Sequence, residues 1–281
     1  MSLILVDVLA PGGPRPADPE APLLHADDLG AVRGDGVFET LLVRDGRACN
    51  LARHEARFRA SAAMLRLPEP DMGLWRRARE LALAAWPGGE AAMRWVYSRG
   101  RESTGRPTGY ILISPAPPRR TRVRVLLAER GFSLDAGARA PWALIGAKTL
   151  SYAANMAALR HAREQGHDDV LFTTAGGELL EGPTSTLVLV RDGALATPDP
   201  GEGILPGTTQ AALFAEAAAA GIDCAAGRLH AAELHAADSA WLVSSVRIAA
   251  RITAVDGMAL PDPGEAAERD FRRLCDRALA R

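Results

Sequence analysis

The chain has 281 residues, of which 48% are hydrophobic and 24% charged, as expected for a globular protein that can bury a sizeable core. Its 33 basic and 34 acidic residues leave a formal net charge of -1, so the charge balance does not favour nucleic acid as a partner. The three cysteines lie far apart and form no C-x-x-C pair, which disfavours a disulfide framework and a zinc knuckle. The N-terminal residues lack a signal-peptide pattern and no apolar run is long enough to span a bilayer, so we expect a cytoplasmic protein without a membrane partner.

Apolar spacing and turn residues predict a mixture of strands and helices in the first 114 residues. The predicted strands are residues 3–8, 36–43, 47–50, 93–98 and 110–114, and the predicted helices are residues 51–65 and 71–85. Residues 115–120 are rich in proline, which stiffens the chain and removes backbone donors, so this run is the best candidate for a linker. We therefore expect an N-terminal domain at 1–114, a linker at 115–120 and a C-terminal domain at 121–281.

The second half continues with alternating strands and helices. The predicted strands are residues 121–127, 170–173, 185–190, 194–196 and 240–244, and the predicted helices are residues 151–165, 208–220 and 265–280. Hairpins outnumber strand-helix-strand crossovers, which favours an α+β fold over a doubly wound parallel sheet.

One compositional feature points to chemistry. Lys148 is the only lysine of the chain, and arginine occupies every other basic position except the histidines. A surface cation tolerates this exchange, but an amine that must lose its proton to attack a carbonyl does not, because a guanidinium stays protonated at physiological pH. Lys148 is therefore a candidate nucleophile, and a surface lysine without a role is the alternative interpretation.

The residues around and after Lys148 fit an enzyme that uses pyridoxal 5'-phosphate (PLP). PLP needs an amine for its aldehyde, donors for its phosphate, a partner for its pyridine nitrogen and a group near its phenolic oxygen. Lys148 can hold the aldehyde as a Schiff base, and Tyr152, one turn away in the predicted helix, can donate to the phenolic oxygen. Glu181 can stabilise the protonated ring nitrogen. A half-buried helix aromatic and an exposed hairpin glutamate are the alternatives for Tyr152 and Glu181.

Three segments offer donors for a phosphate. Arg57 lies on the first long predicted helix, and a guanidinium can bind phosphate through two parallel hydrogen bonds. The segment 205–209 opens a helix, where backbone amides and threonine hydroxyls meet the positive end of the helix dipole. Ser244 and Ser245 follow a strand and add hydroxyl and amide donors. Each signal is weak alone, since an exposed arginine and a helix N-cap are common features.

Six motifs follow one another along nearly the whole chain: Gly34-Asp35-Gly36-Val37-Phe38-Glu39-Thr40, His54-x-x-Arg57, Lys148-Thr149-x-x-Tyr152-x-x-Asn155, Glu181-Gly182, Gly203-Ile204-Leu205-Pro206-Gly207 and Ser244-Ser245-Val246-Arg247. Their order resembles the class IV aminotransferases, which include branched-chain aminotransferases, D-amino-acid aminotransferases and 4-amino-4-deoxychorismate lyases. The resemblance implies a fold-type IV architecture of two α/β domains and a homodimer with sites near the interface. It also implies PLP on Lys148, with Glu181 at the ring nitrogen, Tyr152 near the phenolic oxygen, and a phosphate site formed by Arg57, Gly207, Thr208, Thr209, Ser244 and Ser245.

The chain departs from the family pattern at a few positions. Thr186 and Val188 stand where the family usually has asparagine and an aromatic residue, and Thr208 stands where isoleucine is frequent. The first two departures concern the hydrogen bonds near Ser185 and leave the role of the lysine unaffected.

The substrate is expected to be a small amine with a carboxylate. Arg94 falls where family members place a cation for the substrate carboxylate, and a solvent-facing strand arginine is the alternative. The segment Ser98-Arg99-Gly100 resembles the lyases and the D-amino-acid enzymes more than the branched-chain enzymes, and the chain is compact, as the lyases tend to be. We therefore expect a 4-amino-4-deoxychorismate lyase that makes 4-aminobenzoate and pyruvate by β-elimination for folate synthesis. The alternative is an aminotransferase acting on branched-chain or D-amino acids with 2-oxoglutarate, because both reactions share one carbanion.

Three other classes of protein fit the sequence less well. A metal hydrolase built on His161, His167, Asp168 and Asp169 lacks the H-E-x-x-H spacing, so no metal is expected. The glycines at 201, 203 and 207 miss the G-x-G-x-x-G spacing of a dinucleotide-binding enzyme. The arginines at 119–124 would suit a nucleic-acid-binding module, but acidic residues balance them over the whole chain.

Overall fold

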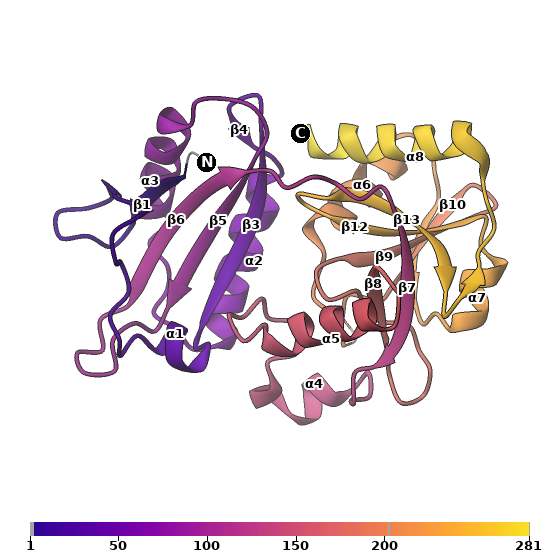
Figure 1. The fold of residues 1–281 in the computed structure, drawn as a ribbon, viewed down its shortest axis with the longest axis horizontal. Coiled ribbons are helices and arrows are strands. Elements are labelled where there is room, and N and C mark those ends of the chain that lie inside the picture. Colours follow the sequence, from indigo (N-terminus) through magenta and orange to yellow (C-terminus); the bar gives the residue numbers. More distant parts are fainter. Residues whose placement is uncertain (1–2, 202, 281) are drawn as a thin grey trace. The chain divides into compact units, whose positions relative to one another are not determined.

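The computed structural model describes residues 3–201 and 203–280, which form two compact units (Figure 1). Among the described residues, the first unit comprises 3–118 and 147–152, and the second comprises 119–146, 153–201 and 203–280. Each unit has its own β-sheet and helices, so the predicted α+β class is confirmed. The sequence did not predict that residues 147–152 join the first unit, and the proposed domain and linker boundaries stay predictions. Among the described residues, every helix is too short or too polar to cross a membrane.

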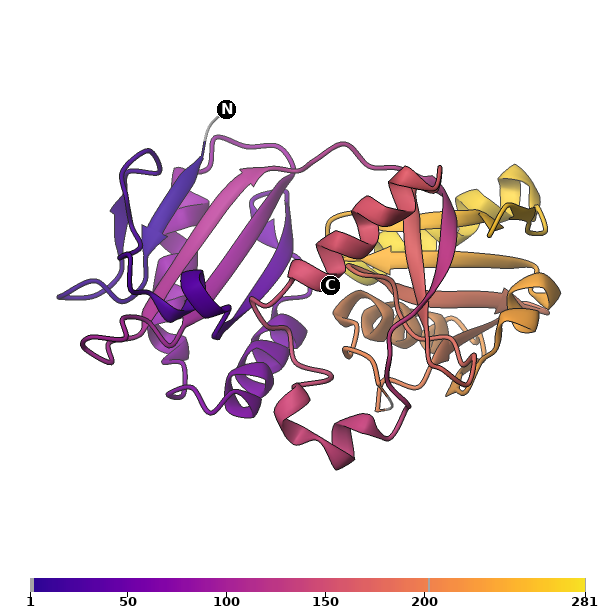
Figure 2. The same ribbon diagram turned by 60° about the horizontal axis from the view of Figure 1, so that its bottom comes forward.

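The first unit is an antiparallel sheet with the strand order β2-β1-β6-β5-β3-β4. Helices α2 and α3 pack on one face, where Phe58 of α2 lies 4.8 Å from Trp75 of α3, measured between ring centroids (Figure 1 and Figure 2). Trp75 also stacks on Trp95 of β5 at 5.4 Å, and these three rings are fully buried. The elements are β1 (Ile4–Asp7), β2 (Arg15–Ala17), α1 (Leu29–Arg33), β3 (Gly36–Arg44), β4 (Arg47–Ala48), α2 (Leu51–Met64), α3 (Met72–Ala85), β5 (Ala91–Ser98) and β6 (Thr108–Pro115).

The opposite face of this sheet carries a different set of side chains. The β3–β5 register pairs Phe38 with Val96 and Thr40 with Arg94. Directly paired residues share a face of the sheet, as do residues two apart on one strand. Phe38, Thr40, Arg94 and Val96 therefore lie on one face, away from α2 and α3, and Arg94 is exposed there.

The second unit is a mixed sheet with the strand order β11-β10-β9-β12-β13-β7-β8, in which β7 runs parallel to both β8 and β13. Helices α6 and α8 pack together, and Phe271 of α8 stacks on Trp241 of β12 at 4.3 Å between ring centroids. The elements are β7 (Arg122–Glu129), α4 (Ala136–Arg139), the 3-10 helix η1 (Pro141–Ala143), α5 (Ala153–Glu164), β8 (Asp169–Thr173), β9 (Thr186–Arg191), β10 (Ala194–Pro198), α6 (Thr208–Ala219), β11 (Cys224–Gly227), α7 (Ala231–Ala236), β12 (Ser239–Ser244), β13 (Ile248–Val255), β14 (Met258–Ala259) and α8 (Gly264–Leu279).

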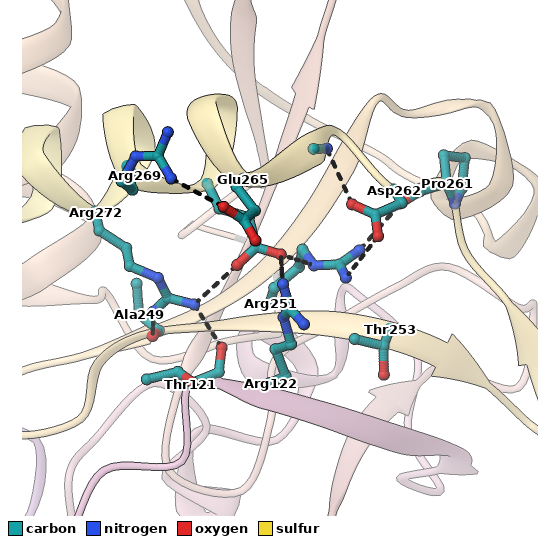
Figure 3. Close-up of polar contacts among 12 residues, drawn as sticks. Thr121, Arg122, Ala249, Arg251, Thr253, Pro261, Asp262, Glu265, Arg269 and Arg272 are labelled. Carbon is teal, nitrogen blue, oxygen red and sulfur yellow. Dashed lines mark hydrogen bonds and ion pairs between the residues drawn. The ribbon is translucent and has the colours of Figure 1, made fainter.

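A largely buried ion network ties α8 to strands β7 and β13 (Figure 3). Glu268 Oε1 lies 2.5 Å from Arg251 Nε and 2.9 Å from Arg122 Nη2. Glu268 Oε2 lies 3.5 Å from Arg272 Nη2, and Arg272 also donates to two backbone carbonyls beside the sheet. Because Arg251 and Glu268 are both buried, losing either charge would leave the other uncompensated in a poorly solvated place. The network therefore fixes α8 against the sheet.

Most predicted strands and helices are present close to their expected positions, and the main omission is β13. This strand lies between β12 and β7 in the sheet, yet the segment Ala249-Ala250-Arg251 has no alternation of apolar and polar residues. Arg251 is buried within it, and its charge is compensated by Glu268 of α8 and by Asp262, which precedes α8. The short elements β2, α1, α4, η1, β11, α7 and β14 were also not predicted.

Candidate active site

The backbone of Lys148 is held by two elements of the first unit. Residues 148–150 lie along the outer edge of β3, where Phe38 N donates to Lys148 O at 3.0 Å and Leu150 N donates to Gly36 O at 2.8 Å. On the other side, Lys148 N donates to Ser61 Oγ of α2 at 3.0 Å. Strand and helix together thus fix the position from which the lysine side chain projects.

The amine of Lys148 lies among aromatic groups. Its Nζ is 3.4 Å from Tyr152 Oη, 4.3 Å from the centroid of the Phe38 ring and 5.2 Å from that of the Tyr152 ring. The Phe38 and Tyr152 rings pack edge to face, with their centroids 5.1 Å apart. The predicted proximity of Tyr152 to Lys148 is present, but its predicted cause is wrong: α5 begins at Ala153, so the tyrosine precedes the helix. A turn in which Tyr152 N donates to Leu150 O brings the hydroxyl back to the amine.

Arg57 is part of a buried charge cluster on α2. Its Nε and Nη2 donate to the two carboxylate oxygens of Glu39 of β3, both at 2.7 Å, and His54 Nδ1 lies 2.7 Å from Glu39 Oε2. Burial disfavours the ionised form of Glu39, but the charge of Arg57 and the hydrogen bonds from Arg57 and His54 outweigh it and lower the pKa of Glu39 to about 2. Burial lowers the pKa of His54, so this imidazole is neutral and donates through Nδ1. Arg57 and Ser61 stand one helical turn apart, so the guanidinium belongs to the α2 face that also contacts the Lys148 backbone.

Arg94 lies on the same face of the first sheet as Phe38, one strand away. Since the Phe38 ring contacts the Lys148 amine, this face carries both the amine and an exposed cation. Of the predicted residues, the first unit therefore contains Lys148, Tyr152, Arg57 and Arg94.

Glu181 is a nearly buried carboxylate of the second unit, not an exposed hairpin glutamate. Its Oε1 accepts a hydrogen bond from Arg130 Nη1 at 2.7 Å, and its Oε2 accepts one from Leu205 N at 3.2 Å. The loop that follows is anchored by Asn155 of α5, whose Nδ2 donates to Pro183 O at 2.7 Å. The second unit thus holds Glu181 in one orientation.

The start of α6 is a site of concentrated donors in the second unit. Gly207 is the N-cap, and a glycine supplies no side-chain oxygen for the first-turn amides. Thr208 and Thr209 in that turn are buried, and Thr209 Oγ1 donates to Ser245 Oγ at 3.5 Å. The predicted residues of the 207–209 and 244–245 segments are therefore neighbours, although they lie far apart in the sequence.

The turn that follows Ser244 and contains Ser245 is held by contacts with residues distant in sequence. Arg119 Nε donates to Val246 O at 2.7 Å, and Arg247 Nη1 donates to Asp169 Oδ2 at 2.6 Å. Ile248 has a φ of 68°, which is costly for a β-branched residue. Such strain persists only where the surroundings impose it, and it lies next to the two predicted phosphate donors.

The arginines and carboxylates considered above for nucleic-acid or metal binding form ion pairs with other residues of the second unit. Asp168 Oδ1 accepts from Arg120 Nη1 at 2.6 Å, Asp168 Oδ2 accepts from Arg124 Nε at 3.2 Å, and Asp169 pairs with Arg247. Across residues 3–201 and 203–280, no group of three His, Cys, Asp or Glu side chains is placed to hold a metal ion. The carboxylates of the metal hydrolase alternative therefore have another use.

Comparison with known proteins identifies the family. The family model for amino-transferase class IV matches residues 36–255. This chain belongs to the class IV aminotransferases. It is 50% identical over 258 residues, 86% of this chain and 89% of the relative, to a bifunctional aminodeoxychorismate lyase / D-amino acid transaminase of Mycobacterium tuberculosis.

Two solved structures of this family match nearly the entire chain. The PLP-bound form of a hypothetical aminotransferase from Mycobacterium tuberculosis is 47% identical with a TM-score of 0.93, and the match covers 99% of both chains. A fold IV-transaminase from Curtobacterium pusillum is 42% identical with a TM-score of 0.92, covering 98% of this chain and 99% of that one. The fold-type IV architecture and PLP dependence expected from the sequence are therefore confirmed.

The donor chemistry of this class IV enzyme fits PLP. The first unit offers an amine beside a phenolic hydroxyl, and the second offers a buried carboxylate and a helix start rich in hydroxyl and amide donors. The helix start has no acidic residue in its first turn that would repel a phosphate. These are the groups that an aldehyde, a pyridine nitrogen and a phosphate require.

Sequence reasoning missed several residues that position these groups. Phe38 and Glu39 lie inside a quoted motif, but the contacts of Phe38 with Lys148 and of Glu39 with Arg57 join distant parts of the chain. Ser61 and Arg130 carry no local signal at all. Alternation along β3 could have indicated that Phe38 and Glu39 face opposite sides of the sheet.

Replacing Gly207 with alanine should weaken the start of α6. A Cβ at this position would lie 2.2 Å from Thr186 Oγ1, although the backbone φ of -73° suits alanine. We expect a stability loss of about 1–3 kcal/mol from overpacking and a lower PLP affinity, measured by thermal unfolding of the apoprotein and by PLP titration. Removing the obstructing hydroxyl in Gly207→Ala/Thr186→Ala should restore most of the stability. Gly227→Ala, where the new Cβ meets nothing within 4 Å, is the matched control.

Proposed function

We propose that the enzyme is a 4-amino-4-deoxychorismate lyase, which forms 4-aminobenzoate and pyruvate. The observation that carries this proposal is the relative from Mycobacterium tuberculosis, which is 50% identical over 86% of this chain and whose name includes aminodeoxychorismate lyase. The amine of Lys148 beside the hydroxyl of Tyr152 supports it, because an elimination needs a positioned base.

We propose the following roles for the cofactor-binding residues. Lys148 bonds to the PLP aldehyde, Tyr152 donates to the phenolic oxygen and Glu181 accepts from the ring nitrogen. The phosphate is bound by the guanidinium of Arg57, by the start of α6 and by the turn after β12, that is by Arg57, Gly207, Thr208, Thr209, Ser244 and Ser245. The bidentate contact with Glu39 supports the role of Arg57, because it sets the orientation of the guanidinium plane.

The proposed reaction depends on proton transfer by Lys148. Bound PLP withdraws electrons from the carbon that carries the substrate amine. The amine of Lys148 would remove the proton from this carbon, while Tyr152 Oη, 3.4 Å from Nζ, would keep the amine in place. The carbon–oxygen bond of the neighbouring enol ether then breaks, its electron pair leaves with the pyruvate moiety, and the ring becomes aromatic. Arg94 binds a substrate carboxylate on the face of the sheet that carries Phe38.

Transamination of D-amino acids is the second candidate activity, because the name of the same relative includes D-amino acid transaminase. Branched-chain amino acids with 2-oxoglutarate remain the other substrate class expected from the family. For either substrate class Lys148 would move the substrate proton without the loss of a leaving group, so the same residues would serve both reactions.

Two assays on one purified preparation test the proposal. One supplies 4-amino-4-deoxychorismate and follows 4-aminobenzoate, and the other supplies D- or branched-chain amino acids with 2-oxoglutarate and follows glutamate. We expect turnover in the first assay. Activity in the second assay alone would overturn the lyase proposal and leave the aminotransferase.

We further propose that the enzyme is a homodimer in the cytoplasm, as the family resemblance and the sequence composition led us to expect. Light scattering of the purified holoenzyme gives its mass directly, and a monomer would contradict the dimer.

A further inference from the structure

The carboxylate of Glu181 already accepts hydrogen bonds from two groups of the second unit. Arg130 Nη1 donates to its Oε1 at 2.7 Å, and the Leu205 amide donates to its Oε2 at 3.2 Å. The two side chains are 25% and 11% exposed, so water screens the pair only in part. Both carboxylate oxygens of Glu181 therefore accept hydrogen bonds from donors within the second unit.

Arg130 is itself fixed in place. Its guanidinium carbon lies 5.0 Å from the centroid of the Phe172 ring and 5.3 Å from that of Phe132. Its backbone amide donates to Thr173 O at 2.9 Å, at the end of β8. Phe172 N also donates to Glu181 O at 2.9 Å, so β8 holds both partners of the ion pair. The contact between Arg130 and Glu181 is thus set by backbone pairing and two aromatic rings, unlike a mobile surface salt bridge.

This arrangement has a direct electrostatic consequence. A carboxylate beside a guanidinium binds a proton less tightly, because the positive charge favours its ionised form. The same positive charge repels a second cation, such as a protonated ring nitrogen held by that carboxylate. Glu181 therefore favours protonation of a ring nitrogen that it holds, and Arg130 disfavours it.

We propose that Arg130 is a positioning residue that keeps Glu181 ionised and oriented while weakening protonation of the PLP ring nitrogen. The inference rests on the proposed placement of Glu181 at that nitrogen. Two side chains of the second unit, Arg130 and Glu181, would then together set how strongly the cofactor withdraws electrons.

The test measures the protonation of the ring nitrogen itself. The holoenzyme is reconstituted with PLP labelled with 15N in the ring, and the 15N chemical shift is followed against pH. In Arg130→Gln the midpoint should rise by about 1 pH unit, because one opposing charge is lost. Phe172→Leu removes a ring beneath the guanidinium but keeps the charge, so its midpoint should rise by less. Arg139→Gln, which breaks an exposed pair with Asp135, is the control and should not move the midpoint.

The outcomes separate this inference from the proposed placement of Glu181. Glu181→Gln should lower the midpoint strongly, and an unchanged midpoint in that variant would refute the placement of Glu181 at the ring nitrogen. If Glu181→Gln lowers the midpoint but Arg130→Gln and Phe172→Leu leave it at the wild-type value, the role of Arg130 is overturned while the placement stands. If Arg130→Gln does not retain PLP, the Phe172→Leu midpoint decides alone. If Arg130 had a purely structural role, Arg130→Gln would lower the unfolding temperature but leave the midpoint of ring-nitrogen protonation unchanged.

Discussion

Replacing Lys148 with alanine should reduce kcat for either proposed reaction by about 10³-fold or more, since a positioned acid–base group alone contributes about 10²–10⁴-fold. In the proposed mechanism, this variant loses both the covalent attachment of PLP and the amine that transfers the proton. The neighbours of the amine, Tyr152 Oη at 3.4 Å and the Phe38 ring at 4.3 Å, carry no basic group that could replace it. Steady-state rates in the lyase and aminotransferase assays measure the loss.

Lys148→Arg is the matched control, because it keeps a long cationic side chain that cannot be deprotonated. It should be as inactive as Lys148→Ala, which separates loss of the amine from loss of the charge. Since the chain has one lysine, borohydride reduction of the holoenzyme should label a single side chain, identified by mass spectrometry of its peptides. An undiminished rate in Lys148→Ala, or a reduced label elsewhere, would contradict the assignment.

Replacing Glu39 with glutamine should destabilise the apoprotein by about 3–5 kcal/mol at pH 7, the usual effect of removing one partner of a buried ion pair. Glu39 is fully buried and accepts from Arg57 twice and from His54 once. A glutamine amide keeps the size but loses the charge that compensates the guanidinium. Chemical unfolding of the apoprotein measures the change without a contribution from bound PLP.

The destabilisation should depend on pH in a defined direction. The pKa of Glu39 falls from 4.5 to about 2 in the folded protein, so its contribution is complete above pH 4.5 and disappears as the pH falls towards 2. The difference in unfolding free energy between wild type and Glu39→Gln should therefore be largest at neutral pH and shrink below pH 4.5. Asp35→Asn, which breaks a half-exposed pair with Arg99, should cost at most about 1 kcal/mol. An equal gap at pH 7 and pH 3 would show that the Glu39 charge is not what stabilises the cluster.

The predicted phosphate donors illustrate how far local patterns extend. The start of α6 was predictable, because glycine and two threonines before an apolar run are a typical helix N-terminus. The contact between Thr209 and Ser245 was not, because it needs β12 to end beside the start of α6. Hydrophobic spacing determines which segments form helices and strands but carries no information about which of their ends meet.

The sequence by itself determined the family and indicated a single candidate nucleophile. Lys148 is the only lysine of the chain. The order of the motifs around Arg57, Lys148 and Glu181 reproduces the class IV pattern, which the family match confirms. These conclusions depend on residue type and order along the chain, both of which are local properties.

Only the tertiary structure decided how these groups are held. It joined residues 147–152 to the first sheet through β3, buried Glu39 against Arg57 and paired Arg130 with Glu181. Charged groups are tolerated in such buried places only when a partner from another part of the fold lies within hydrogen-bonding distance. Because that compensation acts between residues distant in sequence, no pattern of neighbouring residues could reveal it.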